Sequence, residues 1–248
     1  MNDEMIPLSP YDTFRFSCSR DVPCFNECCR DLNQFLTPYD ILRLKNALEM
    51  TSGDFLSEYT LQHTGPESGL PVVTLKPADQ RELICPFVTE DGCRVYENRP
   101  ASCRTYPLAR LASRSRETGE ITEHWALIRE THCRGFEQDK TWNVREWINR
   151  QGLMVYNEMN DLLMEIISLK NQHDQGPLDI KSRHIFHMAC YDIDNFRVHI
   201  FEKGLLDDLE MDKGHLESLK EDTALLKFGM EWVKKTVFNK EFTYGNQR

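Results

Sequence analysis

Eight of the nine cysteines lie between residues 18 and 133, and they fall into two groups of four along the chain. The groups are Cys18, Cys24, Cys28 and Cys29, followed by Cys85, Cys93, Cys103 and Cys133. Thiolates are the soft ligands that select zinc, copper(I), iron and iron–sulfur clusters. Four thiolates make one metal site, so eight can make two. The sequence therefore predicts a protein that holds a metal ion or cluster by sulfur.

The spacing of the cysteines leaves the metal open. Cys28 and Cys29 are adjacent, and neighbouring side chains diverge, so this pair could serve two sites, two irons of one cluster, or one ligand and one structural thiol. The Cys-x2-Cys unit of zinc ribbons is absent from both groups. Iron–sulfur spacing is more permissive. Buried thiols without a metal are the alternative, and Cys133 and one of the adjacent pair suit that interpretation best.

Other candidate ligands lie outside the two groups. His132 precedes Cys133 and could replace it as a ligand. His184, His187 and Cys190 follow one another at intervals of three, which places them on roughly one side of a helix. A second metal site there is one interpretation. The simpler one is that the histidines are structural and that Cys190, within an apolar stretch, belongs to the core.

Arginines are concentrated in one segment of this acidic chain: Arg94, Arg99, Arg104, Arg110, Arg114 and Arg116. Four thiolates leave a zinc or iron–sulfur site with net negative charge, which guanidinium groups would stabilise. Hydrogen bonds to sulfur also tune reduction potentials. Arg99 and Arg104 flank Cys103 and are the first candidates for binding such a cofactor. The alternatives are a substrate carboxylate or phosphate held bidentately and, most of all for residues 110–116, a solvated basic loop.

Composition and length exclude several classes of protein. The formal charge of −10 argues against a general nucleic-acid binder, which needs a basic face. The first residues have neither a basic region nor an apolar stretch, as a signal peptide would. No apolar run approaches the ~20 residues that span a bilayer. We therefore expect a soluble, cytoplasmic protein without nucleic-acid or membrane partners. Thiols stay reduced in that compartment.

The pattern of residues predicts an α+β, mostly helical fold. The expected helices and strands of the first half are a helix over 38–50 capped by Thr37, a shorter helix from Ser52, strands over 70–75, 81–85 and 120–128, and a turn at 90–92 between extended segments. The expected helices of the second half are 142–170, 194–203 and 216–238, with a break at Gly176-Pro177. Residues 1–137 are then a cysteine-cluster metal-chelating domain with short strands and loops. Residues 138–248 form a helical C-terminal extension, which could dock a protein partner.

Several segments together resemble the YkgJ-like cysteine cluster family, a zinc- or iron-chelating domain in which some members are called iron–sulfur oxidoreductases. The segments are Phe16-Ser17-Cys18, Pro23-Cys24-Phe25-Asn26-Glu27-Cys28-Cys29-Arg30, Leu36-Thr37-Pro38-Tyr39-Asp40, Cys85-Pro86-Phe87, Gly92-Cys93-Arg94-Val95-Tyr96, Asn98-Arg99-Pro100-Ala101-Ser102-Cys103-Arg104-Thr105-Tyr106-Pro107 and Cys133-Arg134-Gly135. The resemblance covers about residues 14–137. Glu27 departs from the family, where a glycine is more usual. The resemblance implies that all eight cysteines are metal ligands.

The resemblance does not decide a reaction. The flagellin lysine methylase carries a similar cluster and is associated with an iron–sulfur centre, which makes methyl transfer or radical chemistry conceivable. The radical pattern Cys-x3-Cys-x2-Cys is absent here. Three functions follow: a protein that binds iron, as an iron–sulfur cluster, or zinc; an iron–sulfur enzyme with redox or group-transfer chemistry in a cleft lined by Arg99, Arg104 and Tyr106; and a structural zinc protein that acts as an interaction module.

Overall fold

A computed structural model describes residues 4–30, 32–66, 68–115, 117–173, 176–206 and 211–239 of the chain. The chain divides into two compact units. Residues 1–34 and 75–158 form the first, here called the cysteine unit, and residues 35–74 and 159–248 form the second, here called the helical unit. Each unit thus combines two segments of the chain. The predicted boundary at residue 137, between a cysteine-cluster domain and a helical extension, stays a prediction.

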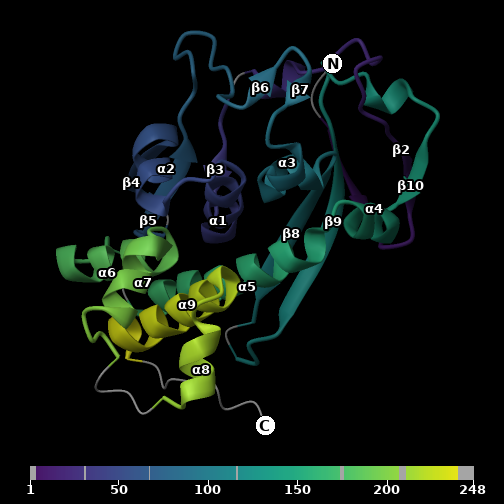
Figure 1. Cartoon of the computed structure of the whole chain (residues 1–248). Helices are drawn as coiled ribbons and strands as arrows, with labels where there is room; N and C mark the ends of the chain where they lie inside the picture. Colours follow the sequence, from purple (N-terminus) through teal and green to yellow (C-terminus); the bar gives the residue numbers. More distant parts are fainter. Residues whose placement is uncertain are drawn as a thin grey trace. The chain divides into compact units, whose positions relative to one another are not determined.

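The cysteine unit consists of short strands and helical turns joined by loops. Its elements are β1 (Glu4–Leu8), β2 (Thr13–Arg15), η1 (Glu27–Cys29), β6 (Val88–Thr89), β7 (Gly92–Cys93), η2 (Tyr96–Asn98), α3 (Ala101–Thr105), β8 (Leu108–Arg114), β9 (Ile121–Arg129), η3 (Gly135–Glu137), β10 (Thr141–Asn143), α4 (Val144–Arg150) and the start of α5 (Leu153–His173). The strands form antiparallel groups in the order β1-β9-β8, β10-β2 and β6-β7. Strands β8 and β9 lie side by side in Figure 1, with Leu108 opposite Leu127.

A compact aromatic and aliphatic core supports this unit. It contains Phe14, Phe16, Leu108, Trp125, Leu127, Val144 and Trp147. The ring of Phe16 meets that of Trp147 edge-on, with 5.6 Å between their centroids. Burying each such side chain contributes about 1.5–3 kcal/mol. Cys133 and Tyr106 pack against this core, so the core fixes the base of the loops that carry the cysteines.

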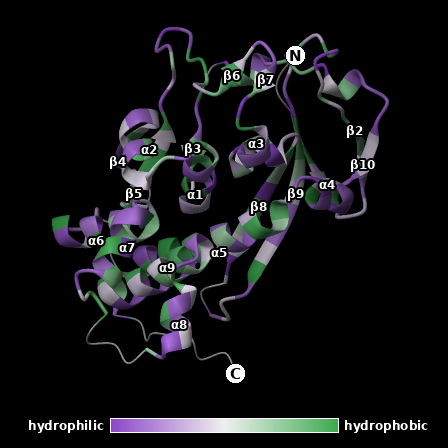
Figure 2. Ribbon diagram, viewed as in Figure 1, coloured by the Kyte–Doolittle hydropathy of each residue, from purple (hydrophilic) through white to green (hydrophobic). Residues whose placement is uncertain are grey.

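The helical unit combines a set of helices with a small sheet. Its elements are β3 (Phe35–Leu36), α1 (Pro38–Ala47), α2 (Ser52–Tyr59), β4 (Thr60–Thr64), β5 (Pro71–Leu75), the remainder of α5, α6 (Ile180–Cys190), α7 (Ile193–Phe201), α8 (Lys213–Ser218) and α9 (Asp222–Phe238). The sheet order is β3-β5-β4. Helix α6 packs on α9. Hydrophobic and hydrophilic segments alternate along α9 in Figure 2, as expected for a helix with a buried side.

The α+β class is confirmed, with short strands followed by a helical C-terminal region. The predicted start of α1 is also confirmed. The Thr37 side chain accepts a hydrogen bond from the Asp40 backbone N–H, the Asp40 carboxylate accepts one from the Thr37 N–H, and Pro38 takes the first helical position. Strands β5 and β9 and the turn between β6 and β7 lie where the sequence predicts them.

Three local predictions are wrong. No strand forms over 81–85. Residues 81–83 form a turn, because the Asp79 carboxylate accepts hydrogen bonds from the backbone N–H groups of Arg81 and Glu82, and Ile84 only forms an isolated bridge to Asp79. The helix predicted over 142–170 is two helices, which Gly152 separates with a positive φ of 61°. The helix predicted over 216–238 begins at 222, where Glu221 caps α9 by accepting from Ala224 N–H. Strand β8 was not predicted.

Among the described residues, no helix combines the length and apolar character needed to cross a membrane.

Candidate metal centre

All eight clustered cysteines belong to the cysteine unit. Four of them, Cys18, Cys24, Cys85 and Cys133, lie between its elements, and the other four lie within the short elements η1, β7 and α3. None is in a disulfide. Cys18, Cys28 and Cys103 are exposed, while the remaining five are half-buried. Exposed or half-buried free thiols that gather in one unit are available as ligands, whereas structural cysteines are usually buried and inert.

One group of thiols is held where the start of the chain meets the loop after β9. The backbone N–H of Arg134 donates a hydrogen bond to Sγ of Cys24, with 3.0 Å between nitrogen and sulfur. The N–H of Ser17 donates to the carbonyl oxygen of Gly135 at 3.0 Å. These bonds place Cys18, Cys24 and Cys133 together. Gly135 is required here, because a Cβ would lie 2.5 Å from the ring of Phe16.

A second group forms where the segment after η1 lies against the loop before β6. The N–H of Cys85 donates to the carbonyl oxygen of Cys29 at 2.9 Å, and the N–H of Leu32 donates to that of Leu83 at 2.9 Å. The β6–β7 hairpin pairs Val88 with Cys93. Cys29, Cys85 and Cys93 are therefore neighbours, although more than fifty residues separate the first from the others.

Backbone N–H groups point at several of the sulfur atoms. Cys85 accepts from Phe87 and Val88, Cys93 accepts from Val95, and Cys133 accepts from Gly135. Burial is the largest influence on the pKa of these three thiols and raises it, while the N–H bonds oppose that rise, because a hydrogen bond to sulfur favours the thiolate. The loops thus supply donors that favour the form of sulfur that ligates metal.

Opposing effects keep most of the cluster protonated without a cation. Burial, followed by repulsion from Cys28, Cys24 and Cys133, raises the pKa of Cys18 to about 11. A hydrogen bond from Cys29 lowers the pKa of Cys28 to about 7, and the same bond raises the pKa of Cys29. A bound cation would remove the repulsion, so metal binding should release protons.

Arg99 and Arg104 are buried, each about 8% exposed, and they brace the loops around Cys93 and Cys103. The Arg99 guanidinium stacks on Tyr96, 3.8 Å from the ring centroid, and donates to the Tyr96 carbonyl oxygen and to Oε1 of Gln151 at 2.5 Å each. Burial raises the pKa of the Cys18 and Cys93 thiols, and the positive charge of Arg99 opposes that rise. It therefore favours thiolates by charge.

Arg104 donates to the carbonyl oxygen of Gln151 at 2.7 Å and to that of Glu97. The third predicted cofactor-binding residue, Tyr106, has a buried hydroxyl beside Cys133 and Glu130, and burial is the main cause that raises its pKa. These contacts support the loops that carry the cysteines. Whether the three residues bind a cofactor stays a prediction.

Two glutamines in the site were not predicted. Gln151 accepts from Arg99 through its side chain and from Arg104 through its backbone. Oε1 of Gln34 accepts from Oγ of Ser102 at 2.8 Å and from Sγ of Cys103 at 3.6 Å. An isolated glutamine has no sequence motif that would predict such a contact.

The remaining candidates are dispersed. Arg110 lies on strand β8 and pairs with Glu123 at 2.8 Å, so it is not part of a loop. Arg114 ends the same strand, and Arg116 lies outside the described residues. Arg94 lies over the ring of Phe87, with its Cζ 5.3 Å from the centroid. Nε2 of His132 is 3.7 Å from a carboxylate oxygen of Glu130.

Helix α6 carries His184, His187 and Cys190. Cys190 is 1% exposed, which confirms that it belongs to the core. Across the described ranges, no three histidine, cysteine, aspartate or glutamate side chains stand close enough to hold an ion as they are placed. The eight thiols fit a sulfur-bound metal by donor type, and four of them also accept backbone N–H bonds.

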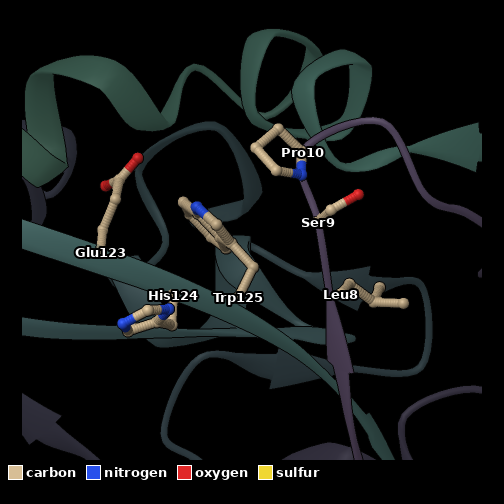
Figure 3. Close-up of a pocket in the computed structure, with 6 residues that line it drawn as sticks. All are labelled: Leu8, Ser9, Pro10, Glu123, His124 and Trp125. Atoms are coloured by element: carbon tan, nitrogen blue, oxygen red, sulfur yellow. The ribbon is translucent and has the colours of Figure 1, made fainter.

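A separate pocket of about 370 Å³ lies at the edge of the β1-β9-β8 sheet. Leu8, Ser9, Pro10, Glu123, His124 and Trp125 line it, and Figure 3 shows the two segments that contribute them. None of these residues is a cysteine, so this pocket is distinct from the thiol cluster.

Comparison with known proteins identifies one family. The family model CxxCxxCC, described as a putative zinc- or iron-chelating domain, matches residues 17–143, just over half of the chain. The matched range contains all eight clustered cysteines and ends before Cys190. No curated protein and no solved structure matches the chain.

Proposed function

Because this chain belongs to the CxxCxxCC family of putative zinc- or iron-chelating domains, we propose that it binds iron, as an iron–sulfur centre, through its eight clustered cysteines. The observation that supports this most is the directed hydrogen bonding of the cluster. Backbone N–H groups reach Sγ of Cys24, Cys85, Cys93 and Cys133. Such bonds stabilise thiolates and tune the reduction potential of sulfur-bound iron.

The choice of iron over zinc rests on the spacing of the thiols. The chain lacks the Cys-x2-Cys turn from which zinc ribbons take two ligands. It has the adjacent pair Cys28–Cys29, and two neighbouring thiols suit a centre with more than one metal atom. When bound, an iron–sulfur centre would supply one-electron chemistry. The chain itself contributes the thiolates, the N–H donors and the positive charge of Arg99.

The first test is metal analysis with a visible spectrum on the full chain purified without oxygen. We expect iron and sulfide in comparable amounts and a broad visible absorption that bleaches on reduction. Zinc without colour would contradict the iron–sulfur centre and favour the structural zinc protein. A chain that holds neither metal, even after incubation with iron and sulfide or with zinc, would contradict metal binding altogether.

Variants then connect the metal to the thiols. Cys24→Ser and Cys103→Ser should each lower the metal content, because each removes one ligand. Cys190→Ser is the matched control, since Cys190 is buried in the helical unit, and it should keep the wild-type metal content. Full metal content in both cluster variants would show that these residues are not ligands. Catalytic activity, cytoplasmic location and a protein partner for the C-terminal helices stay predictions.

A further inference from the structure

We propose that the pocket at the edge of the β1-β9-β8 sheet binds a free amino acid with an apolar side chain. The pocket is separate from the thiol cluster, and binding there does not depend on the metal. Its volume of about 370 Å³ lies at the small end of the range for ligand sites, which is about 300–1,000 Å³. A pocket of this size suits a small metabolite.

Backbone contacts hold the segment after β1, which forms one wall of the pocket. The Ser9 N–H donates to Oδ2 of Asp12 at 2.7 Å, and the Asp12 N–H donates to the Ser9 carbonyl oxygen at 3.1 Å. The N–H of Arg145 on α4 donates to the Pro10 carbonyl oxygen at 3.3 Å. This wall is therefore preformed, so binding requires little ordering of the chain.

Apolar side chains make up much of the pocket lining. Leu8 lies opposite Trp125 in the pairing of β1 with β9, and Pro10 follows Leu8 by two positions. Figure 3 shows Trp125 and Glu123 projecting from β9 toward Pro10, while His124 points to the other side of the strand, as alternation along a strand requires. The pocket thus offers an apolar surface to the side chain of a ligand.

The indole N–H of Trp125 is a donor without a partner among the described residues. Trp142 and Trp147, the other tryptophans of the cysteine unit, donate to the carbonyl oxygens of Phe16 and Thr105 at 2.9 and 3.0 Å. Trp125 is only 4% exposed, yet no described group accepts from its N–H. A buried tryptophan usually has such a partner. Because Trp125 lines the pocket, an acceptor on a ligand is in position to bind this N–H.

Glu123 supplies an acceptor on the same side of β9. Nε of Arg110 donates to Oε2 of Glu123 at 2.8 Å, and the Arg110 side chain is only 14% exposed. The other carboxylate oxygen of Glu123, Oε1, has no hydrogen bond within the described part of the chain, and this side chain is 46% exposed. The ion pair is neutral as a whole, so a ligand without net charge complements it best.

A ligand for this pocket needs an acceptor for Trp125, a donor for Glu123 and an apolar body. A free amino acid supplies all three, because its carboxylate can accept from the indole N–H, its ammonium can donate to Glu123, and its side chain can contact Leu8 and Pro10. An amine without a carboxylate leaves the indole N–H unpaired, and a carboxylate without an amine offers no donor to Glu123. An unsatisfied polar group at a binding site costs affinity.

Probes that share one side chain test the two polar contacts. Titration calorimetry on the full chain measures binding of L-phenylalanine, of phenethylamine, which lacks the carboxylate, and of 3-phenylpropionate, which lacks the ammonium. L-Leucine is added as an amino acid with a smaller side chain. The better of the two amino acids should bind at least about tenfold more tightly than either analogue, since each analogue loses a hydrogen bond to a charged group. An analogue that binds as tightly, or no binding of either amino acid, would overturn the proposal.

Two substitutions assign the contacts in a crossed pattern. Glu123→Gln should weaken L-phenylalanine and phenethylamine about tenfold but not 3-phenylpropionate, because only the first two carry the ammonium. Trp125→Phe keeps an aromatic ring and removes the N–H, so it should weaken L-phenylalanine and 3-phenylpropionate but not phenethylamine. Glu120→Gln is the matched control, because Glu120 is exposed just before β9 and does not line the pocket. Equal losses for all three probes in either pocket variant would contradict the assigned contacts.

Folding and metal content are measured alongside binding. If Trp125→Phe does not fold, Glu123→Gln still decides, because its side chain is nearly half exposed and its replacement leaves the core intact. Metal content should equal that of the wild type in Glu123→Gln and Glu120→Gln, since neither substitution touches a cysteine. A wild type that binds an amino acid but no metal would overturn the proposed function alone, and the reverse result would overturn only this inference.

Discussion

The two units of the chain use the same residue type in opposite ways. In the cysteine unit, eight thiols are exposed or half-buried, have other thiols as neighbours and, at four positions, accept backbone N–H bonds. In the helical unit, Cys190 is 1% exposed, and burial alone raises its pKa. A cysteine in the first setting is accessible and lies among other potential ligands, while one in the second behaves as a small apolar side chain. The role of a cysteine in this chain therefore depends on its surroundings and not on its residue type alone.

The buried lysine and arginine side chains also differ between the two units. In the helical unit, Lys45 pairs with Asp194 at 3.1 Å, and Lys234 pairs with Glu165 at 2.6 Å. In the cysteine unit, the hydrogen bonds of Arg99 and Arg104 go to carbonyl and amide oxygens, which are neutral. The lysine charges are balanced by carboxylates, whereas the two arginines bond to neutral oxygens, and the charge of Arg99 opposes the rise in the pKa of Cys18 and Cys93. This arrangement suits a site that gathers negative charge when it is loaded.

Metal removal should give the largest difference between the units. Structural metal sites can contribute on the order of 10 kcal/mol to the folded state, and the segments here that carry the cysteines contain only short elements such as η1, β7 and α3. We expect a strong chelator to abolish hydrogen-exchange protection across residues 17–34 and 83–135, while the amides of α6 and α9 keep theirs. Peptide-resolved hydrogen exchange with and without chelator measures this. Equal loss in both units would show that the comparison between them is wrong.

Glycine substitutions should have effects of intermediate size, and only the substitution in the cysteine unit should change the metal content. A Cβ at Gly135 would lie 2.5 Å from the Phe16 ring, and one at Gly229 would overlap the Ala189 carbonyl oxygen where α6 meets α9. Each Gly→Ala change should cost about 1–3 kcal/mol through overpacking. Only Gly135→Ala should also lower metal content, because it displaces the loop that carries Cys133. Thermal unfolding combined with metal analysis tests the pair, and a loss of metal in Gly229→Ala would contradict the expectation.

Cys190→Ser should destabilise the helical unit without changing the metal. A hydroxyl in the site of a fully buried thiol costs about 1–3 kcal/mol when it finds no partner. Cys190→Ala is the matched control, because it removes the sulfur without introducing a polar group. Denaturant unfolding should rank wild type, Ala and Ser in falling order of stability, with metal content equal in all three. A reduced metal content in either variant would mean that Cys190 is a ligand.

Local signals in the sequence predicted local structure well. Thr37 and Asp40 cap α1 through contacts three residues apart, and the turn before Cys93 forms between neighbouring strands. The wrong predictions also have local causes, but the side chains responsible cannot be told from ordinary solvated polar residues in the sequence. Asp79 folds the predicted strand into a turn, and Glu221 begins a new helix inside the predicted one. A cap inside a periodic apolar pattern is difficult to distinguish from a solvated residue.

The sequence predicted the metal-ligating thiols of the candidate site, but it did not predict the long-range contacts that hold them. Residue type alone identifies the eight thiols. The contact of Cys24 with Arg134 spans 110 positions, and no spacing rule reaches across such a distance. Gln34 and Gln151, which hold Cys103 and Arg99, carry no motif. The contacts between cysteine loops that are distant in the sequence depend on the packed core around Phe16 and Trp147. Sequence patterns predict which residues belong to a core, but they do not predict which loops that core brings together.

The smallest expected effect is a pH dependence of the helical unit that the thiols do not share. Burial lowers the pKa of His187 below its ordinary value of 6.5, with a smaller contribution from His184 and an opposing one from Asp192. Nε2 of His187 is buried without a hydrogen-bond partner, so protonation would place an unbalanced charge there. Because the folded pKa is lowered, the unfolded chain binds the proton more readily. The stabilising effect is present above pH 6.5 and is lost as the pH falls below it.

Thermal unfolding of the helical unit, followed by hydrogen exchange of α6 in the metal-free chain, should therefore show falling stability from pH 7 to 5. Using metal-free protein removes proton competition at the thiols, which would otherwise lower stability over the same range. His187→Gln should flatten the profile, whereas His184→Gln, at an exposed position of the same helix, should leave most of it. If both variants keep the wild-type slope, the acid sensitivity lies in other groups, and the neutral buried imidazole is not its cause.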